Sequence, residues 1–489
     1  MPTPTPNIAD MLALHGRQRP RQVAIIHGDN TLDYQTLDLQ VSRRAAHLQA
    51  LGVQAGDIVG IALPDSIEYL LMLYAVARAG GVILPLDCRW KPFEKQRVAA
   101  HFKPVLVLVE PDAVFEGARC VPVDATWLHD IEHAALPVAF PDGDRGLLMS
   151  LSSGTTGRPK GPMLTHAQLV YRFYMHWAEL GLGSRERYLN ATPLYFGGGR
   201  AFSMSSLYAG STVVLCPPPY TPAELAAEVS RTGASVLFLV PTLLRRLLEE
   251  TPETLAPLRS LHTLISSGSA LTADERHLIR THICPHFLEY YSSTEGGGVS
   301  TLSPEDQLIH PDSVGRPALS VDVQIVDAQD RELPRNTVGH IRYRGPAVAE
   351  CFHADPEASA QSFRDGWFYP GDLGAMNEDG YLFLKGRSKD MIIRGGVNIY
   401  PQEIEATLTT HPAVLEAAVV GWPSREFNEE VAAFVILKTD TSADELVAWC
   451  KSALASYKVP RQIFIRADFP RTSLGKVIKA ELVQQLTPV

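Results

Sequence analysis

Short apolar segments alternate with helical ones over roughly the first 300 residues, and no other feature constrains the fold as much. Residues 36–51 carry apolar side chains at helical spacing with basic residues between them. Residues 57–63 form an apolar run bounded by turn residues, which is typical of a buried strand, and residues 67–78 predict the next helix. Further runs that predict strands lie at 82–86, 105–109, 146–151, 213–216 and 236–240. This alternation predicts an α/β architecture of mainly parallel sheets flanked by helices.

The pattern changes near residue 320. Residues 321–327 and 340–344 alternate between apolar and polar side chains, which predicts half-exposed strands of an antiparallel sheet or small barrel-like subdomain. Residues 402–489 return to a mixed α+β pattern. These changes predict a large N-terminal domain and a smaller C-terminal one, with a linker near 385–395.

Charge and hydropathy exclude several classes of partner. Lys and Arg number 44 and Asp and Glu number 54, so the formal net charge is −10. A chain this acidic has no overall attraction to nucleic acid or anionic lipid. The longest apolar stretch, residues 70–86, is interrupted by Arg78 and by Gly80 and Gly81. It therefore predicts a helix, a turn and a strand, and no membrane span.

The cysteines indicate a reducing compartment. There are six, no Cys-x-x-Cys pair occurs, and the closest two, Cys88 and Cys120, are 32 residues apart. The first residues also lack a basic segment followed by an apolar core, so we expect no secretion signal. We predict a cytoplasmic protein with reduced thiols.

The segment that carries the strongest chemical signal is LSSGTTGRPKG, residues 151–161. It packs two serines, two threonines, three glycines and two cations into eleven residues directly after a predicted strand. Glycine lets the backbone approach a ligand, while hydroxyl and N–H groups donate to phosphate oxygens and the cations add charge. The predicted phosphate contacts are Ser152, Ser153, Gly154, Thr155, Thr156, Gly157 and Lys160.

This segment is not the phosphate loop of the P-loop NTPases. That motif places Gly before its lysine and Ser or Thr after it. Here Pro159 precedes Lys160 and Gly161 follows it. A kinase-like or GTPase-like function is therefore disfavoured.

Residues 151–161 instead resemble the phosphate-binding signature of the adenylate-forming enzymes, which include acyl-CoA synthetases, adenylation domains of peptide synthetases and firefly luciferase. Four more segments resemble motifs of that family, in the family's order. They are YYSSTE at 290–295, DGWFYPGD at 365–372, GRSKDMIIRGG at 386–396 with NIYPQEIE at 398–405, and PRTSLGK at 470–476. The resemblance spans essentially the whole chain and is closest to the acyl-CoA synthetase branch.

The resemblance implies an ATP- and Mg²⁺-dependent acid–thiol ligase. A carboxylic acid and ATP would give an acyl adenylate and pyrophosphate, and the thiol of coenzyme A would then displace AMP. It also implies an N-terminal ATP- and acid-binding domain over 1–386, a hinge over 387–395, and a mobile C-terminal lid domain over 390–489. Lys389 matches the hinge pivot, and Gly395 and Gly396 would border the channel for the pantetheine arm of CoA.

The family's nucleotide contacts carry over residue by residue. Thr294 and the 152–160 loop would hold the ATP phosphates, and Glu295 would bind Mg²⁺, an ion that prefers hard oxygen ligands. Tyr291 would lie against the adenine ring. Ser269 and Ser292 would also contact ATP.

Three further residues complete the expected nucleotide site. Asp372 would accept hydrogen bonds from both ribose hydroxyls, because a carboxylate has two acceptor oxygens, and Arg387 would contact the same ribose. Lys476 would bridge the acid and the α-phosphate and stabilise the charge that develops when two anions meet. Thr294, Glu295 and Lys476 are therefore the predicted catalytic residues.

The expected acid pocket departs from the family pattern. Tyr195 or Phe196 stands where acyl-CoA synthetases often have histidine, and Gly197 opens a run of three glycines. Arg200 is a candidate partner for a second negative group on the acid, although an arginine that supports the pocket from behind is the simpler interpretation. Ser267 and Gly268 resemble the small-residue segment that borders the pocket. Another departure is Tyr369, where the family more often has threonine.

One absence narrows the acid. Members that activate amino acids use an aspartate near position 195 to pair with the α-amino group, and no aspartate occurs from Arg145 to Ala273. An ammonium group without a partner in a closed pocket is unfavourable. We therefore expect a fatty or aryl acid and not an α-amino acid.

Other readings stay open at this point. The acceptor thiol belongs either to CoA or to a carrier protein, which would be a separate chain because only 13 residues follow Lys476. A degenerate binding module is disfavoured because Lys476, Glu295 and Asp372 are all present. A luciferase-type oxygenase shares these motifs. The expected assembly is a monomer or a homodimer.

Overall fold

The computed structural model describes residues 6–136, 143, 145–151, 160–471 and 477–487. The chain forms two compact units. Unit 1 comprises Met1–Val323 and Tyr343–Phe368, and unit 2 comprises Gln324–Arg342 and Tyr369–Val489. The chain therefore passes between the units three times, and each unit has its own hydrophobic core.

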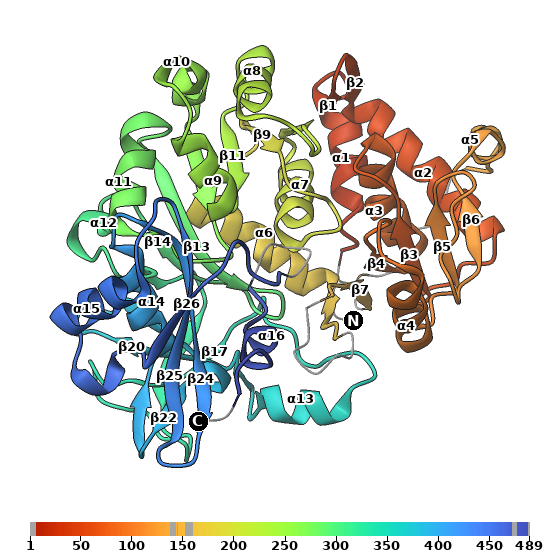
Figure 1. Cartoon of the computed structure of the whole chain (residues 1–489). Coiled ribbons are helices and arrows are strands. Elements are labelled where there is room, and N and C mark those ends of the chain that lie inside the picture. Colours follow the sequence, from red (N-terminus) through yellow and green to blue (C-terminus); the bar gives the residue numbers. More distant parts are fainter. Residues whose placement is uncertain (1–5, 137–142, 144, 152–159, 472–476, 488–489) are drawn as a thin grey trace. The chain divides into compact units, whose positions relative to one another are not determined.

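Unit 1 contains a nine-stranded sheet in the order β15-β14-β13-β12-β11-β9-β10-β1-β2 (Figure 1). The strands from β13 to β1 pair in parallel, and β2, β14 and β15 add antiparallel edges. The strands are β1 (Val23–His27), β2 (Asn30–Asp33), β9 (Arg187–Asn190), β10 (Thr212–Leu215), β11 (Val236–Leu239), β12 (Thr263–Ser266), β13 (Phe287–Ser293), β14 (Gly297–Leu302) and β15 (Arg316–Pro317).

A second sheet of unit 1 has six strands in the order β6-β5-β3-β4-β7-β8. All neighbours pair in parallel except β7 and β8. The strands are β3 (Ile58–Ala62), β4 (Val82–Pro85), β5 (Leu106–Val109), β6 (Cys120–Pro122), β7 (Gly146–Met149) and β8 (Met163–Thr165).

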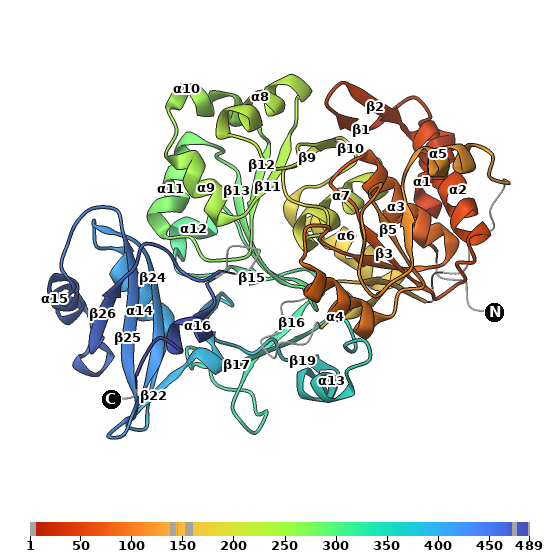
Figure 2. The same cartoon turned by 45° about the vertical axis from the view of Figure 1, so that its right-hand side comes forward.

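Helix α3 (Ile67–Ala79) lies between these two sheets, and one core cluster joins it to strands of both (Figures 1 and 2). Every residue from Tyr69 to Ala79 is buried, as expected for a helix that is apolar on all sides. The Ser66 hydroxyl caps its first turn by accepting from the Tyr69 N–H, and Gly80 ends it in the left-handed conformation.

The other helices of unit 1 cover the faces and edges of the sheets. They are α1 (Asp10–Gln18), α2 (Tyr34–Ala50), α4 (Pro92–Phe102), α5 (Ala125–Glu132), α6 (His166–Leu180), α7 (Gly197–Ala209), α8 (Pro222–Thr232), α9 (Pro241–Leu248), α10 (Pro252–Leu255), α11 (Ala273–His282), α12 (Asp306–Ile309) and α13 (Pro356–Ser362). Two short strands, β18 (Phe363–Arg364) and β19 (Trp367–Phe368), follow α13.

Unit 2 begins with antiparallel strands. They are β16 (Asp322–Val326), β17 (Gly339–Arg344), β20 (Asp372–Met376) and β21 (Leu382–Arg387). A second sheet follows, in the order β23-β22-β25-β24 with β26 paired to β25. Its strands are β22 (Ile392–Arg394), β23 (Val397–Ile399), β24 (Val414–Ser424), β25 (Asn428–Leu437) and β26 (Gln462–Ile465).

Helices cover both faces of this second sheet. Helices α14 (Pro401–Thr409) and α15 (Ala443–Ala453) share a core with Val419 and Val431, whereas α16 (Lys479–Val483) shares one with Val420 and Ala432. Neighbouring strand residues therefore point to opposite faces, as the two-residue period requires.

The expected fold class is confirmed. The predicted helix over 36–51 is α2, the predicted strands over 57–63 and 82–86 are β3 and β4, and the alternating segments near 321 and 340 are β16 and β17. Within the described part of the chain, no helix combines the length and apolar character that a bilayer crossing needs.

Candidate active site

Thr294 and Glu295 lie in the tight turn that joins antiparallel strands β13 and β14 of unit 1. Both residues are half-buried. The Ser293 hydroxyl beside them accepts a hydrogen bond from the Gly296 N–H at 2.8 Å and contacts the Tyr343 hydroxyl at 2.6 Å. The turn is therefore held at both of its ends.

A buried arginine of α6 holds the same turn from behind. Arg172 Nη1 donates to the Thr294 carbonyl oxygen at 3.1 Å, and Nη2 donates to that of Glu295 at 2.7 Å. Its Nε donates to the Ala347 carbonyl oxygen at 3.0 Å. Burial lowers the pKa of Arg172 to about 10, opposed by the nearby Glu295 carboxylate and two tyrosines. Sequence reasoning missed this residue, because nothing local to 172 predicts the contact.

The segment around Ala347 links helix and turn a second time. Gln168, one turn before Arg172 on α6, donates to the Val348 carbonyl oxygen at 2.9 Å. The Ala349 N–H donates to the Glu295 carbonyl oxygen, also at 2.9 Å. The Glu295 carbonyl therefore has two protein donors, and the backbone of the turn is fixed while its side chains extend from it.

The predicted adenine segment and one side of the predicted acid pocket are neighbours. Tyr291 and Ser292 lie just before Ser293, the last residue of β13, and Ser267 follows the adjacent strand β12. The hydroxyls of Ser267 and Ser292 are 3.1 Å apart. Gly268, with φ +108°, and Ser269 are exposed just beyond them. Parallel strands present their carboxyl ends at one edge of a sheet, where α/β proteins commonly bind ligands.

The other predicted acid segment precedes helix α7. Tyr195 and Phe196 are half-buried with ring centroids 5.6 Å apart, and Gly197 starts the helix with no atom within 4 Å of where a Cβ would stand. Gly198 has the opposite surroundings, because a Cβ there would lie 2.7 Å from the Phe238 ring. The segment thus places two aromatic rings directly before an exposed glycine and a tightly packed one.

Arg200 supports this segment from inside. Its Nη1 donates to the carbonyl oxygens of Leu194 (3.3 Å) and Tyr195 (2.8 Å), and its Nη2 donates to the Ser150 hydroxyl at 2.7 Å. Its Nε has no partner among the described residues. Burial lowers the pKa of Arg200 to about 10. These contacts account for its buried position without an acidic ligand.

Acidic residues just beyond the ends of β3 and β4 reach the same segment, and sequence reasoning missed them. Asp65 accepts the Leu194 N–H at 2.8 Å, and Arg89 bonds both Asp87 (2.9 and 3.1 Å) and the Tyr195 hydroxyl. Burial raises the pKa of Asp65 to about 6. The available signal was their position just beyond the carboxyl ends of two predicted strands.

The predicted ribose contacts come together in unit 2. Asp372 starts β20 opposite Arg387, the last residue of β21, and Arg387 Nε lies 2.9 Å from Asp372 Oδ1. Arg387 Nη1 also donates to the Pro370 carbonyl oxygen at 2.7 Å. Tyr369, where the family more often has threonine, is bonded instead to Arg342 at 3.0 Å.

The predicted hinge and channel residues follow directly. Lys389 is exposed in a short 3₁₀ turn, Ser388–Asp390, between β21 and β22. Gly395 and Gly396 are the two central residues of the β22–β23 hairpin, with φ of +55° and +85°. Such a two-residue turn requires positive φ at both positions, which explains the glycine pair locally.

Part of the predicted site lies outside the described residues, namely Ser152, Ser153, Gly154, Thr155, Thr156, Gly157 and Lys476. Of the phosphate segment, Lys160 is described, and its Nζ lies 5.5 Å from the centre of the Phe352 ring.

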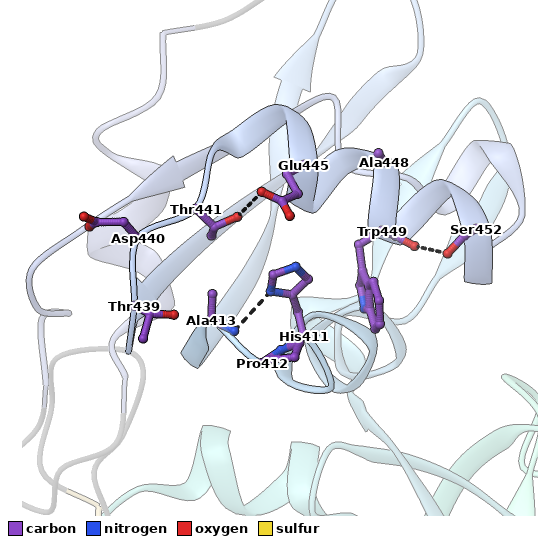
Figure 3. A pocket seen from close by; sticks show the side chains of 10 residues that line it. All are labelled: His411, Pro412, Ala413, Thr439, Asp440, Thr441, Glu445, Ala448, Trp449 and Ser452. Atoms are coloured by element: carbon purple, nitrogen blue, oxygen red, sulfur yellow. Dashed lines mark hydrogen bonds between the residues drawn. The ribbon is translucent and has the colours of Figure 1, made fainter.

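A shallow hollow in unit 2 contains none of the predicted site residues (Figure 3). His411 and Trp449 form its floor with rings edge to face, 5.1 Å apart. Several of its polar groups bond to neighbours. His411 Nδ1 accepts the Ala413 N–H, and Thr441 donates to Glu445.

The described residues contain no cluster of three or more His, Cys, Asp or Glu side chains suited to a metal ion. Mg²⁺ usually binds through one or two carboxylates together with substrate phosphates and waters, so a single carboxylate at Glu295 fits an ion that arrives with ATP.

Comparisons with known proteins agree with this geometry. A family model described as AMP-binding enzyme matches residues 12–353, and one described as AMP-binding enzyme C-terminal domain matches 403–476. Feruloyl-CoA synthase from an Amycolatopsis species is 34% identical over 480 residues, covering 95% of this chain and 96% of the relative. Indoleacetate–CoA ligase from Aromatoleum aromaticum is 31% identical over 501 residues, covering 98% of each.

A solved structure shows the same similarity. O-succinylbenzoate coenzyme A synthetase from Bacillus subtilis, in complex with ATP and magnesium ion, is 27% identical, with a TM-score of 0.89 over 98% of this chain and 100% of that one. The predicted adenylate-forming fold and acid–CoA ligase class are confirmed. The chain belongs to the AMP-binding enzyme family.

Proposed function

We propose that this enzyme activates an aromatic carboxylic acid with MgATP and transfers the acyl group to coenzyme A. The observation that carries the acid class is the segment before α7, where the half-buried rings of Tyr195 and Phe196 lie 5.6 Å apart directly before the exposed Gly197. Nearby acidic groups have partners: Asp65 accepts the Leu194 N–H and Asp87 pairs with Arg89. A free carboxylate for an α-amino group is therefore lacking among the described residues of this segment. Feruloyl- and indoleacetate-activating relatives support an aryl acid.

In the first step, a carboxylate oxygen of the acid bonds to the α-phosphorus of ATP, and the bond from that phosphorus to pyrophosphate breaks. Thr294 would donate its hydroxyl to a phosphate oxygen, and Lys160 would add positive charge. Lys476 would hold the two approaching anions together and stabilise the transition state. Bound Mg²⁺ neutralises polyphosphate charge, and Glu295 would supply its carboxylate ligand.

In this proposal, Asp372 binds the ribose. Its carboxylate would accept hydrogen bonds from the vicinal diol, and Arg387, whose Nε lies 2.9 Å from Asp372 Oδ1, orients it. In the second step the CoA thiolate attacks the acyl carbon and AMP leaves. We propose that the pantetheine arm passes Gly395 and Gly396, and that Lys389 is the pivot of a hinge over 387–395 between domains at 1–386 and 390–489.

The direct test supplies ATP, Mg²⁺, CoA and a pooled panel of cinnamic, benzoic, indoleacetic, fatty, dicarboxylic and amino acids, and identifies products by mass spectrometry. We expect aryl-CoA thioesters, and Lys476→Ala should abolish acyl adenylate formation. Fatty acyl-CoA as the main product would overturn the aromatic assignment. Acyl adenylate without thioester would indicate a carrier-protein acceptor, and no product from the whole panel would contradict the proposal.

A further inference from the structure

We propose that Arg172 is a positioning residue for MgATP. Its guanidinium fixes the backbone of Thr294 and Glu295, so that the two side chains meet phosphate and metal in one geometry. The inference rests on the proposed function of that turn. It adds to the proposed site a residue of α6 that is far from the turn in sequence. The side chain of this residue would contact neither Mg²⁺ nor ATP.

All three guanidinium nitrogens make hydrogen bonds. Three nitrogens of Arg172 each donate to a different carbonyl, those of Ala347, Thr294 and Glu295, at 2.7–3.1 Å. A planar fork with fixed N–H directions holds three acceptors at set relative positions. A lysine ammonium is a single point and cannot reach all three.

Among the described residues, Arg172 forms no ion pair with a carboxylate, although the Glu295 carboxylate is near enough to favour its charged form, and this separates it from most other buried arginines. Arg44, Arg78 and Arg276 are each paired with an acidic side chain. Arg172 bonds only carbonyl oxygens of the backbone. Burying a guanidinium without hydrogen-bond partners is unfavourable, so the arrangement depends on the turn keeping its carbonyl oxygens in place.

The two glycines that follow Glu295 leave the turn little freedom. A Cβ at Gly296 would overlap the Tyr343 ring, and one at Gly297, where φ is +72°, would lie 3.0 Å from Arg172 Nε. Tyr343 is buried and bonded to Ser293. Loss of the Arg172 fork would therefore release the Thr294 and Glu295 backbone from one side only, which moves their side chains without unfolding the strands.

The experiment compares Arg172→Lys with Arg78→Lys. Arg78 is a matched control, because it is buried in the same unit and also donates to backbone carbonyls, those of Ala9 and Asp38, away from the turn. The measurements are thermal stability, the apparent Mg²⁺ activation constant, KM for MgATP and for the acid, and the rise in Tm that MgATP causes.

For Arg172→Lys we expect the Mg²⁺ constant and KM for MgATP to rise about 10- to 100-fold, as for residues that orient metal ligands. The MgATP-induced rise in Tm should disappear, while KM for the acid changes less than about twofold, because the acid segment has its own supports. Arg78→Lys should lower Tm and leave both MgATP constants unchanged.

Equal loss of Tm in both variants with unchanged Mg²⁺ constants would overturn the inference. The variant Glu295→Gln tests the proposed function of the turn separately from the inference about Arg172. If it leaves the Mg²⁺ constant unchanged, Glu295 does not bind Mg²⁺ and the assigned role of the turn is wrong. If Arg172→Lys does not fold, Gln168→Ala replaces it, since Gln168 anchors Val348 in the adjoining segment. A two- to fivefold rise in the Mg²⁺ constant would then support the inference, and no change would contradict it.

Discussion

Two tight turns carry predicted site residues, and their supports differ. The β13–β14 turn of unit 1 is bound through its backbone, by Arg172 and by the Ala349 N–H. The β22–β23 hairpin of unit 2 has a backbone hydrogen bond at its turn, from the Gly395 N–H to the Phe427 carbonyl oxygen at 2.8 Å, and side chains next to the turn make further contacts. Arg394 pairs with Glu430 at 2.6 Å and lies 4.3 Å from the centre of the Phe427 ring.

The two turns also differ in how closely their glycines are packed. The position of a Cβ at Gly296 is filled by Tyr343, whereas a Cβ at Gly396 would meet nothing within 4 Å. Backbone anchoring with full packing suits a turn that must present a metal ligand and a phosphate donor in one arrangement. A turn with open space beside one of its glycines suits a slender substrate arm that passes it, which is our proposal for the hairpin.

The largest effect is expected from Gly296→Ala, which places a methyl group against the Tyr343 ring. Tyr343 is buried and held by Ser293, so the turn must move. We expect a loss of about 1–3 kcal/mol in stability and a roughly 100-fold slower adenylation, since a displacement of about 1 Å has that effect on catalysis. Pyrophosphate release measures the rate. Gly183→Ala, where a Cβ meets nothing within 4 Å, is the control; equal behaviour of the two variants would break the comparison.

The Asp65 carboxylate accepts the Leu194 N–H, so its ionisation tests what a charged group contributes when it anchors the backbone before α7. Burial raises its pKa in the folded state to about 6, above the unfolded value, so folding favours the protonated acid. The ionised form then destabilises the protein above pH 6 by about 2–3 kcal/mol, and that penalty fades as the pH falls toward 4. We expect the stability of Asp65→Asn relative to wild type to be higher at pH 7.5 than at pH 5. A difference independent of pH in denaturant titrations would contradict this.

Glu430 should behave in the opposite way. The hydrogen bond from Arg394 holds its pKa in the folded state below the usual value, so its contribution is present above the unfolded pKa and is lost as the pH falls through the folded one. We expect Glu430→Gln to cost about 1–2 kcal/mol at pH 7, with acid adenylation unchanged. Glu403→Gln, which removes a more exposed pair with Lys458, should cost less. Equal losses would show that burial of the pair does not matter.

The alternation of apolar and helical segments is a local property, so the sequence predicted strands such as β3, β4 and β10 within two residues. It also predicted that Asp372 and Arg387 act together, because motif order determines that pairing. It did not predict Arg172, Asp65 or Arg89. Their contacts join residues 106 to 129 positions apart, from Arg89–Tyr195 at the short end to Asp65–Leu194 at the long end. Only the folded arrangement creates such contacts.

The sequence alone also did not decide between a functional and a conformational role for Gly395 and Gly396. Motif resemblance predicted a channel role, whereas the local rule that a two-residue hairpin favours Gly-Gly was sufficient to predict their conformation. A local explanation and a functional one coexist at these positions, and stability alone does not separate them.

Alanine substitutions at two matched glycines separate the local explanation from the functional one. Their expected effect is the smallest of the four predictions. Gly396 and Gly380 lie in unit 2 with φ of +85° and +82°, and a Cβ at either position would meet nothing within 4 Å. Alanine at either site should therefore cost about 1 kcal/mol through the same left-handed strain. If the pantetheine arm passes the hairpin, Gly396→Ala should also raise KM for CoA severalfold while adenylation stays at the wild-type rate, and Gly380→Ala should change neither. Identical CoA kinetics in the two variants would leave the hairpin glycines with a conformational role alone, and the comparison of the two turns would then rest on how each is anchored.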